Sequence, residues 1–288
     1  MKKTTIIILC IILVMTIYGC RKGEATGEYQ ALIFSFSDSG NGVRHEREYH
    51  YWSDDRIDES DVSKSITITV DGVKRQATYQ DDAIKRPPNP YPEYFYKDDN
   101  NCSVMVDAEG KLTSYVWGMP TNTQGTHNNL SEEGCLKIAR DFLSELVDVE
   151  QYHIDTEYVS EQKRYTFKFT KYINNQKTAD MATISVWETG ELCSFTSTML
   201  GKIPLTTQCN FDMDKVEQTI YEKLDSIYAD AKKAYDKVEY EIVTSYATIL
   251  ESGEVALVAY VDVDCVRQVG QNFQSVGSKI GFVIARNE

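Results

Sequence analysis

Histidine is the first residue type to consider for chemistry, and the chain has only four. Two of them bound the run His45-Glu46-Arg47-Glu48-Tyr49-His50. A zinc protease places two histidines four residues apart on one face of a helix. Here the spacing is five, in a segment (Glu46–Trp52) that we predict to be a strand, where the two side chains point to opposite faces. The pattern therefore predicts no metal site, and we expect no cofactor.

Paired carboxylates are the second possibility. Asp262 and Asp264 lie two residues apart in a predicted strand and so share one face. They are either part of a solvated strand face or the acid groups of a hydrolase, in which Asp262 and Asp264 or Glu251 would line a cleft where carboxylates of raised pKa face each other. The nucleophile-elbow pattern Gly-x-Ser-x-Gly and the phosphate-binding loop pattern are absent. We therefore predict no catalytic residue and no enzyme, with a carboxylate-dependent extracytoplasmic hydrolase as the alternative.

Aromatic residues in a proline-rich segment provide a candidate binding surface. Residues 86–96 contain four of the six prolines, so this segment is predicted to be extended. Tyr91, Tyr94 and Tyr96 lie in it. Tyrosine offers a large contact area at a small cost in entropy, so these rings either present a surface to a peptide or sugar or cover a sheet beneath them.

The cysteine pattern predicts two buried free thiols and leaves one disulfide pairing open. The chain has seven, and none shows the spacing of a redox pair or a zinc knuckle. Cys135 and Cys102 are predicted to be buried free thiols. Cys193 and Cys209 are either free or joined across a strand–helix connection.

The first twenty residues predict export. Lys2 and Lys3 precede an uncharged, largely aliphatic stretch that is shorter than a membrane-spanning helix and fits the apolar core of a secretory signal. The segment Ile17-Tyr18-Gly19-Cys20 resembles the lipobox of bacterial lipoproteins, although Ile17 replaces the usual Leu and Tyr18 is bulky. This resemblance implies a signal peptide at 1–19, a lipid on Cys20, a tether at 20–28 and an extracytoplasmic location at the cell membrane. More than one acyl chain is needed for stable anchoring, and the modification of this family supplies at least two.

The net charge narrows the range of partners. The chain has 44 acidic and 30 basic residues, a net charge of −14. Nucleic-acid binding normally shows as a basic surface, so no nucleic-acid partner is expected. A protein, peptide or wall-polymer ligand remains, together with the membrane that Cys20 would reach.

The chain divides into a β-rich N-terminal unit and two units that each begin with a helix. Alternating residues and turn pairs such as Asp71-Gly72 predict hairpins throughout 29–118. Ser131 is a predicted helix N-cap followed by an apolar stripe and then strands, which gives a unit at 131–202. Asp212 or Asp214 caps a second helix, also followed by strands, which gives a unit at 212–288.

Short motifs in the middle of the chain resemble a known family. Leu130-Ser131-Glu132-Glu133-Gly134, Tyr165-Thr166-Phe167-Lys168-Phe169 and Val186-Trp187-Glu188-Thr189-Gly190 are similar to PepSY-type and YcdB/YcdC-type repeats of Gram-positive surface proteins. The resemblance implies an extracytoplasmic binding or regulatory module and supplies no catalytic residue.

Together these patterns predict an α+β fold with antiparallel sheets. We expect each sheet to curl on one helix, in tandem cystatin-like or PepSY-like units after the β-rich unit. The expected function is that of a membrane-anchored, non-catalytic binding module. A solute-capture lipoprotein is a further alternative, although the alternating strand–helix pattern typical of such proteins is missing.

Overall fold

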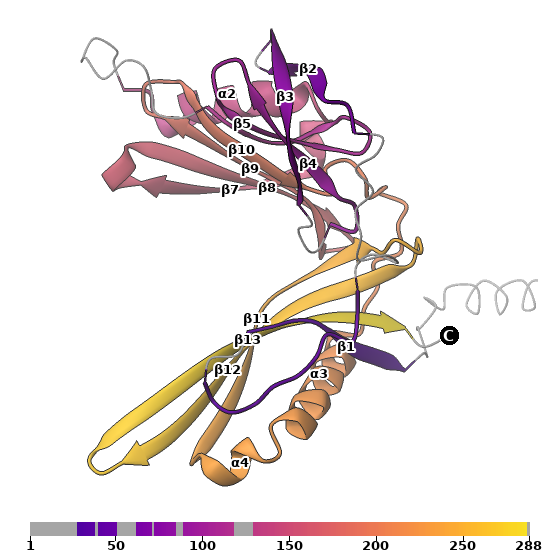
Figure 1. Ribbon diagram of the computed structural model, residues 1–288, viewed down its shortest axis with the longest axis vertical. Helices are drawn as coiled ribbons and strands as arrows, with labels where there is room; N and C mark the ends of the chain where they lie inside the picture. Colours follow the sequence, from indigo (N-terminus) through magenta and orange to yellow (C-terminus); the bar gives the residue numbers. More distant parts are fainter. Residues whose placement is uncertain are drawn as a thin grey trace, which may run out of the picture.

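The computed structural model describes residues 28–37, 40–50, 62–70, 72–84, 89–117 and 129–286. Within these ranges the chain forms thirteen strands and three α-helices (Figure 1). The helices are α2 (Glu132–Ser144), α3 (Met213–Ile227) and the short α4 (Ala231–Ala234). The strands are β1 (Tyr29–Phe36), β2 (Ser65–Val70), β3 (Val73–Ile84), β4 (Glu93–Asp98), β5 (Ser103–Asp107), β6 (Leu112–Val116), β7 (Tyr152–Val159), β8 (Arg164–Ile173), β9 (Gln176–Trp187), β10 (Leu192–Thr198), β11 (Lys237–Ile249), β12 (Val255–Val269) and β13 (Asn272–Arg286).

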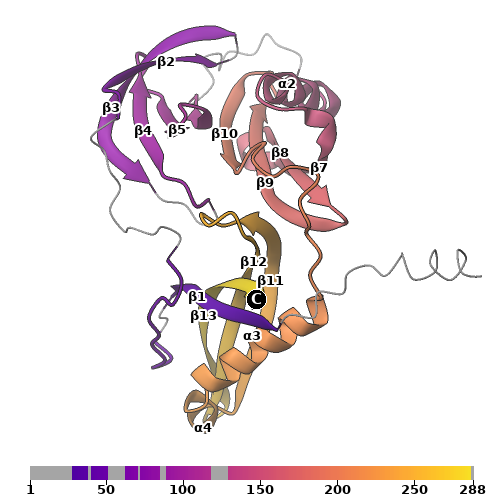
Figure 2. The same cartoon turned by 90° about the vertical axis from the view of Figure 1, so that its right-hand side faces the viewer.

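All thirteen strands belong to one mixed sheet. Its main path runs β1-β13-β12-β11-β9-β10-β6-β5-β4-β3-β2, and β8 and β7 extend from β9. Neighbouring strands are antiparallel except β11 and β9, which pair in parallel through Ala247 and Thr178. Figures 1 and 2 show the sheet as two lobes that meet at this pairing, with α2 on one lobe and α3 on the other.

The prediction of an α+β fold made of separate helix-covered units is wrong. The predicted units are joined by backbone pairing, because β10 pairs with β6 and β9 pairs with β11. The result is one large mixed sheet with few helices rather than tandem cystatin-like units. Sequence periodicity identifies strands and helices, but it cannot show which strand edges pair, and an unpaired strand edge is a template for further pairing.

Both predicted helix starts are confirmed. The Ser131 side chain accepts a hydrogen bond from the Gly134 amide at 3.3 Å, and Asp212 accepts one from the Lys215 amide at 3.3 Å. Serine and aspartate are favoured at this position because they satisfy amides that lack a partner within the helix. Asp212, and not Asp214, is therefore the N-cap of α3.

The N-terminal strand lies far from the hairpins that follow it in sequence. β1 forms at Tyr29–Phe36 as predicted, but it pairs with β13 near the C-terminus. Gly281 of β13 makes the close approach possible, because a Cβ atom there would lie 2.5 Å from the Phe34 ring. The return strand predicted at 46–52 is wrong for residues 46–50, which form no strand, and residues 51 and 52 lie outside the described residues. The amides of Glu48 and Tyr49 instead donate to the Ile33 carbonyl.

Three apolar clusters fill the fold. The first extends across the predicted boundary between 29–118 and 131–202, so that Tyr115 of β6 and Phe142 of α2 belong to one core. The second lies between α3 and the strands β1, β12 and β13. The third, which includes Ile203 and Ala247, lies where the two lobes join. No helix within the described residues is long and apolar enough to cross a bilayer.

Candidate functional site

The three candidate tyrosines occupy different environments in one region. Tyr94 and Tyr96 lie in β4, so this part of the predicted extended segment is a sheet strand. Tyr96 is 2% exposed and donates a hydrogen bond from its hydroxyl to the Ser63 carbonyl at 3.0 Å. Tyr94 is half-buried, and Tyr91 is 37% exposed just before the strand. Tyr96 therefore covers the sheet, as one of the two predicted alternatives describes, whereas Tyr91 faces solvent.

A groove runs beside β4 and contains two of these tyrosines. Its volume is about 450 Å³. The approach to β2, β4 itself and the turn after β5 form its walls. Its lining residues are Val62, Ser63, Ile66, Tyr94, Tyr96, Val106, Asp107, Ala108, Glu109 and Gly110. The groove thus combines aliphatic and aromatic side chains with two carboxylates at one end, a combination typical of sites that hold a ligand through apolar contacts and orient it with a few polar groups.

Asp107 is the central polar group at the acidic end. Its side chain is 2% exposed, and Oδ1 accepts hydrogen bonds from the amides of Glu109 and Lys111 at 3.0 and 2.9 Å. Its second oxygen, Oδ2, lies 2.7 Å from Lys202 Nζ. Lys202 Nζ also lies 4.9 Å from the centre of the Tyr91 ring. Tyr91 is therefore connected to the groove through Lys202 and Asp107.

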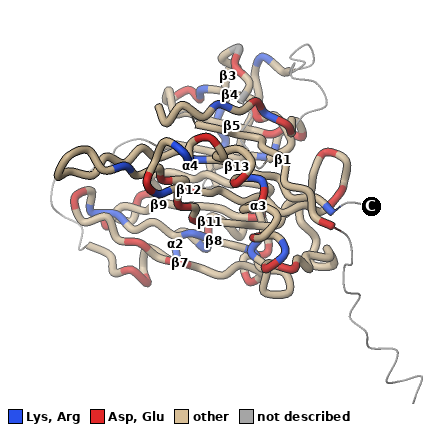
Figure 3. Tube along the Cα trace, turned by 90° about the horizontal axis from the view of Figure 1, so that it is seen from below, with Lys and Arg blue, Asp and Glu red and all other residues tan. Residues whose placement is uncertain are grey.

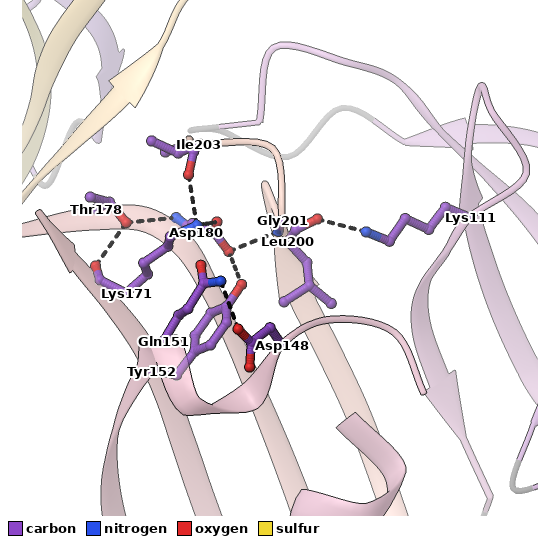
Figure 4. A network of polar contacts seen from close by, with 10 residues as sticks. All are labelled: Lys111, Asp148, Gln151, Tyr152, Lys171, Thr178, Asp180, Leu200, Gly201 and Ile203. Atoms are coloured by element: carbon purple, nitrogen blue, oxygen red, sulfur yellow. Dashed lines mark hydrogen bonds and ion pairs between the residues drawn. The ribbon is translucent and has the colours of Figure 1, made fainter. Parts of the chain in front are cut away.

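Lys202 belongs to a turn, Met199–Ile203, that we name the strap. The strap is held from two sides, by a residue close to the groove and by a buried residue of β9. On the groove side, Lys111 Nζ donates to the Leu200 carbonyl at 2.8 Å. On the other side, the Gly201 amide donates to Asp180 Oδ1 at 2.9 Å, as Figure 4 shows. These contacts therefore fix the backbone of the strap, and with it the backbone position of Lys202 relative to Asp107.

A buried ion pair holds the far side of the strap. Lys171 of β8 and Asp180 of β9 have side chains that are 5% and 0% exposed, with Lys171 Nζ 3.3 Å from Asp180 Oδ2 (Figure 4). Lys171 Nζ also donates to the Ile203 carbonyl at 2.7 Å, and the Tyr152 hydroxyl donates to Asp180 at 2.6 Å. Burial, followed by the charge of Asp180 and this hydrogen bond, raises the pKa of the Tyr152 phenol well above its usual range. Thr178, which pairs with β11 where the lobes join, donates to the Lys171 carbonyl at 2.8 Å.

The other chemical candidates do not come together. Among the described residues no group of three or more His, Cys, Asp and Glu side chains is arranged to hold a metal ion. His45 lies 3.9 Å from Glu48 in a segment without regular structure. Asp262 pairs with Lys279 at 3.3 Å, and Glu251 lies in the turn at the far end of β12, about 20 Å away at the usual rise of a strand.

The cysteines of the described region are free. This holds for both Cys193 and Cys209, so the pairing considered for them does not form. Cys135 and Cys265 are fully buried, and Cys102 is half-buried. Burial raises the pKa of the Cys135 thiol, which keeps it protonated and unreactive. Cys20, the predicted lipid attachment site, and the remainder of 1–27 lie outside the described residues.

Sequence reasoning missed the strap and its ion pair, although a signal was present. Lys171 has the same strand parity as the apolar Phe167 and Phe169, and Asp180 has the same parity as Ala182 and Ile184. A buried charged side chain needs a partner of opposite charge. A lysine and an aspartate on buried strand faces therefore each predict an ion-pair partner. Lys202 carried no such signal, because its meeting with Asp107 depends on the path of the strap.

Comparison with known proteins identifies the family to which this β-sheet protein belongs. The sequence model of the YcdB and YcdC repeated domain matches residues 27–199, which is more than half of the chain. The protein therefore belongs to this family, and the predicted YcdB/YcdC resemblance is confirmed. The solved C-terminal domain of YpeB from Bacillus megaterium is similar over 68% of this chain and 88% of its own, with 11% identity and a TM-score of 0.31. No curated protein matches the sequence.

Proposed function

We propose that the protein is a membrane-anchored, extracytoplasmic lipoprotein that acts as a non-catalytic binding module. Its ligand is a protein, peptide or wall polymer, and its binding surface is the groove lined by Tyr94 together with the exposed Tyr91 nearby. The observation that carries the binding role is that half-buried Tyr94 and buried Asp107 line one groove, with exposed Tyr91 linked to Asp107 through Lys202. Family membership agrees with a module of this kind but assigns no ligand.

The groove suits an extended ligand better than a reaction. Its lining offers apolar contacts from residues such as Val62 and Ile66 alongside polar groups such as Ser63 and Asp107. An extended peptide or polymer gains affinity from alternate contacts of this type. Aromatic rings at the edge add contact area with little loss of side-chain entropy.

Binding is tested with the full chain, purified in a non-ionic detergent, against an array of extended peptides and against purified peptidoglycan. The double variant Tyr91→Ala with Tyr94→Ala should lose at least ten-fold in affinity. The matched control is Tyr158→Ala with Tyr172→Ala, because these tyrosines are 46% and 42% exposed on other strands. Equal loss in both double variants, or no ligand for the unchanged chain in either format, would overturn the groove as the binding site.

Anchoring is tested separately in a bacterium that processes lipoproteins. Cys20→Ser should release the protein from the membrane fraction. Without a diacylglyceryl group the variant lacks the two acyl chains that stable anchoring requires. Mass spectrometry of the unchanged protein should find the lipid on Cys20. A Cys20→Ser variant retained like the unchanged protein would refute the lipid anchor and leave the groove proposal intact.

A further inference from the structure

We propose that the groove recognises a basic side chain of an extended peptide, and that Lys202 occupies the carboxylate of Asp107 until such a side chain replaces it. This inference rests on the proposed binding function and names the chemistry of the ligand. It follows from how the protein places one of its own ammonium groups against Asp107, a residue that lines the groove.

Lys202 shows that an ammonium group fits at this position. Its Nζ lies 2.7 Å from Asp107 Oδ2, 4.0 Å from a Glu109 oxygen and 4.9 Å from the centre of the Tyr91 ring. Two carboxylates and an aromatic face together form a recognised environment for an organic cation. Asp107 and Glu109 also line the groove, so a ligand that lies there is next to both residues.

Asp107 has binding capacity that the turn does not use. Both hydrogen bonds from the turn amides go to Oδ1. Oδ2 is buried and, within the described part of the chain, accepts no hydrogen bond of good geometry, so that Lys202 neutralises it as an ion pair only. A buried carboxylate oxygen without a well-aligned donor gains from a ligand that supplies one.

The strap keeps its conformation without the Lys202 side chain. The Leu200 carbonyl is held by Lys111, the Gly201 amide by Asp180 and the Ile203 carbonyl by Lys171. None of these contacts involves Lys202, whose side chain is 24% exposed. Its ammonium can therefore move into solvent while the groove remains assembled, which makes Lys202 an exchangeable occupant.

The overall charge favours the same ligand class. The net charge is −14, and acidic residues occur along the whole of the described chain (Figure 3). A negative field draws cationic ligands toward the protein and repels anionic ones. Affinity for a basic peptide should consequently fall as salt is added, since partly exposed charges are screened.

The test measures binding of a capped tetralysine peptide to the full chain in detergent, with a capped tetraserine peptide as the neutral comparison. Lys202→Ala should tighten tetralysine binding at least ten-fold, because the internal competitor is gone. Lys168→Ala is the control, since it removes a lysine from an exposed pair with Glu157 and changes the net charge equally. Tetraserine binding should not respond to either variant.

Variants of the two carboxylates should change the affinity for tetralysine in the opposite direction. In the Lys202→Ala background, Asp107→Asn should abolish the gain and Glu109→Gln should weaken tetralysine binding about three-fold. If Asp107→Asn does not fold by circular dichroism, Glu109→Gln alone decides, because Glu109 is 78% exposed and has no role in the core.

Three results would overturn the inference. One is equal tightening by Lys202→Ala and Lys168→Ala, which would show a response to net charge alone. Another is no tetralysine binding to either the unchanged chain or Lys202→Ala at millimolar peptide. The third is a neutral ligand that depends on Tyr91 and Tyr94 but does not respond to Lys202→Ala, and this result would leave the proposed binding function standing while removing its cationic ligand.

Discussion

Removal of the buried Lys171 ammonium is the most informative perturbation of this fold. Lys171→Met keeps the length of the side chain but leaves the Asp180 carboxylate, which is 0% exposed, without its cation. The Tyr152 hydroxyl and the Gly201 amide remain as donors to Asp180, whereas the Ile203 carbonyl loses its donor. The strap then loses one of its three backbone attachments.

The magnitude follows from the burial of both partners. Breaking a buried pair by removing one partner costs about 3–5 kcal/mol, because the remaining charge stays desolvated. This is a large part of the roughly 5–15 kcal/mol that stabilises a typical folded protein. Lys171→Met should therefore lower the free energy of unfolding by about 3–5 kcal/mol. The double variant Lys171→Met with Asp180→Leu should recover part of this loss, since no uncompensated charge remains.

Urea unfolding followed by circular dichroism measures the effect. Lys168→Met is the matched control, because Lys168 lies on the same strand and pairs with Glu157 at 3.6 Å with both side chains more than half exposed. Exposed pairs contribute about 0–1 kcal/mol. A loss below 1 kcal/mol for Lys171→Met, or equal losses for Lys171→Met and Lys168→Met, would refute the argument that the ion pair holds the strap.

Two further predictions concern pH and packing. Burial and Asp180 raise the pKa of Tyr152 above its usual value of 10.0, so the contribution of Tyr152 to stability is complete below pH 10 and is lost as pH rises further. In Tyr152→Phe the free energy of unfolding should therefore depend less steeply on pH above 10, and an unchanged dependence would contradict this. Gly281→Ala should destabilise the fold by about 1–3 kcal/mol through overpacking against Phe34, where the added Cβ would lie 2.5 Å from the ring. Gly277→Ala on the same strand is the comparison, because the nearest atom to its Cβ would be a side-chain oxygen of Asp264 at 3.1 Å. Thermal unfolding that ranks the two variants in the opposite order would refute the role of Gly281.

Local features of the fold were predictable because local residues decide them. Ser131 and Asp212 cap their helices through amides three residues away, so the sequence pattern contains the whole interaction. The hairpin of β2 and β3 forms around Gly72, whose φ of +69° suits glycine. The predicted segment from Tyr91 to Tyr96 does lie next to the groove, but alternation along a strand alone did not show that Tyr96 is buried.

The sequence by itself determined the helix starts, the hairpins, the acidic charge and the family, since each depends on residues close together in the chain or on composition. Tertiary structure alone decided that β1 pairs with β13, that the predicted units share one sheet, and that Lys202 meets Asp107, which lines the groove. The physical reason is that strand edges present the same backbone donors and acceptors whatever their sequence. The choice of partner therefore depends on burial and close packing, as at Gly281, between residues that are far apart in the chain.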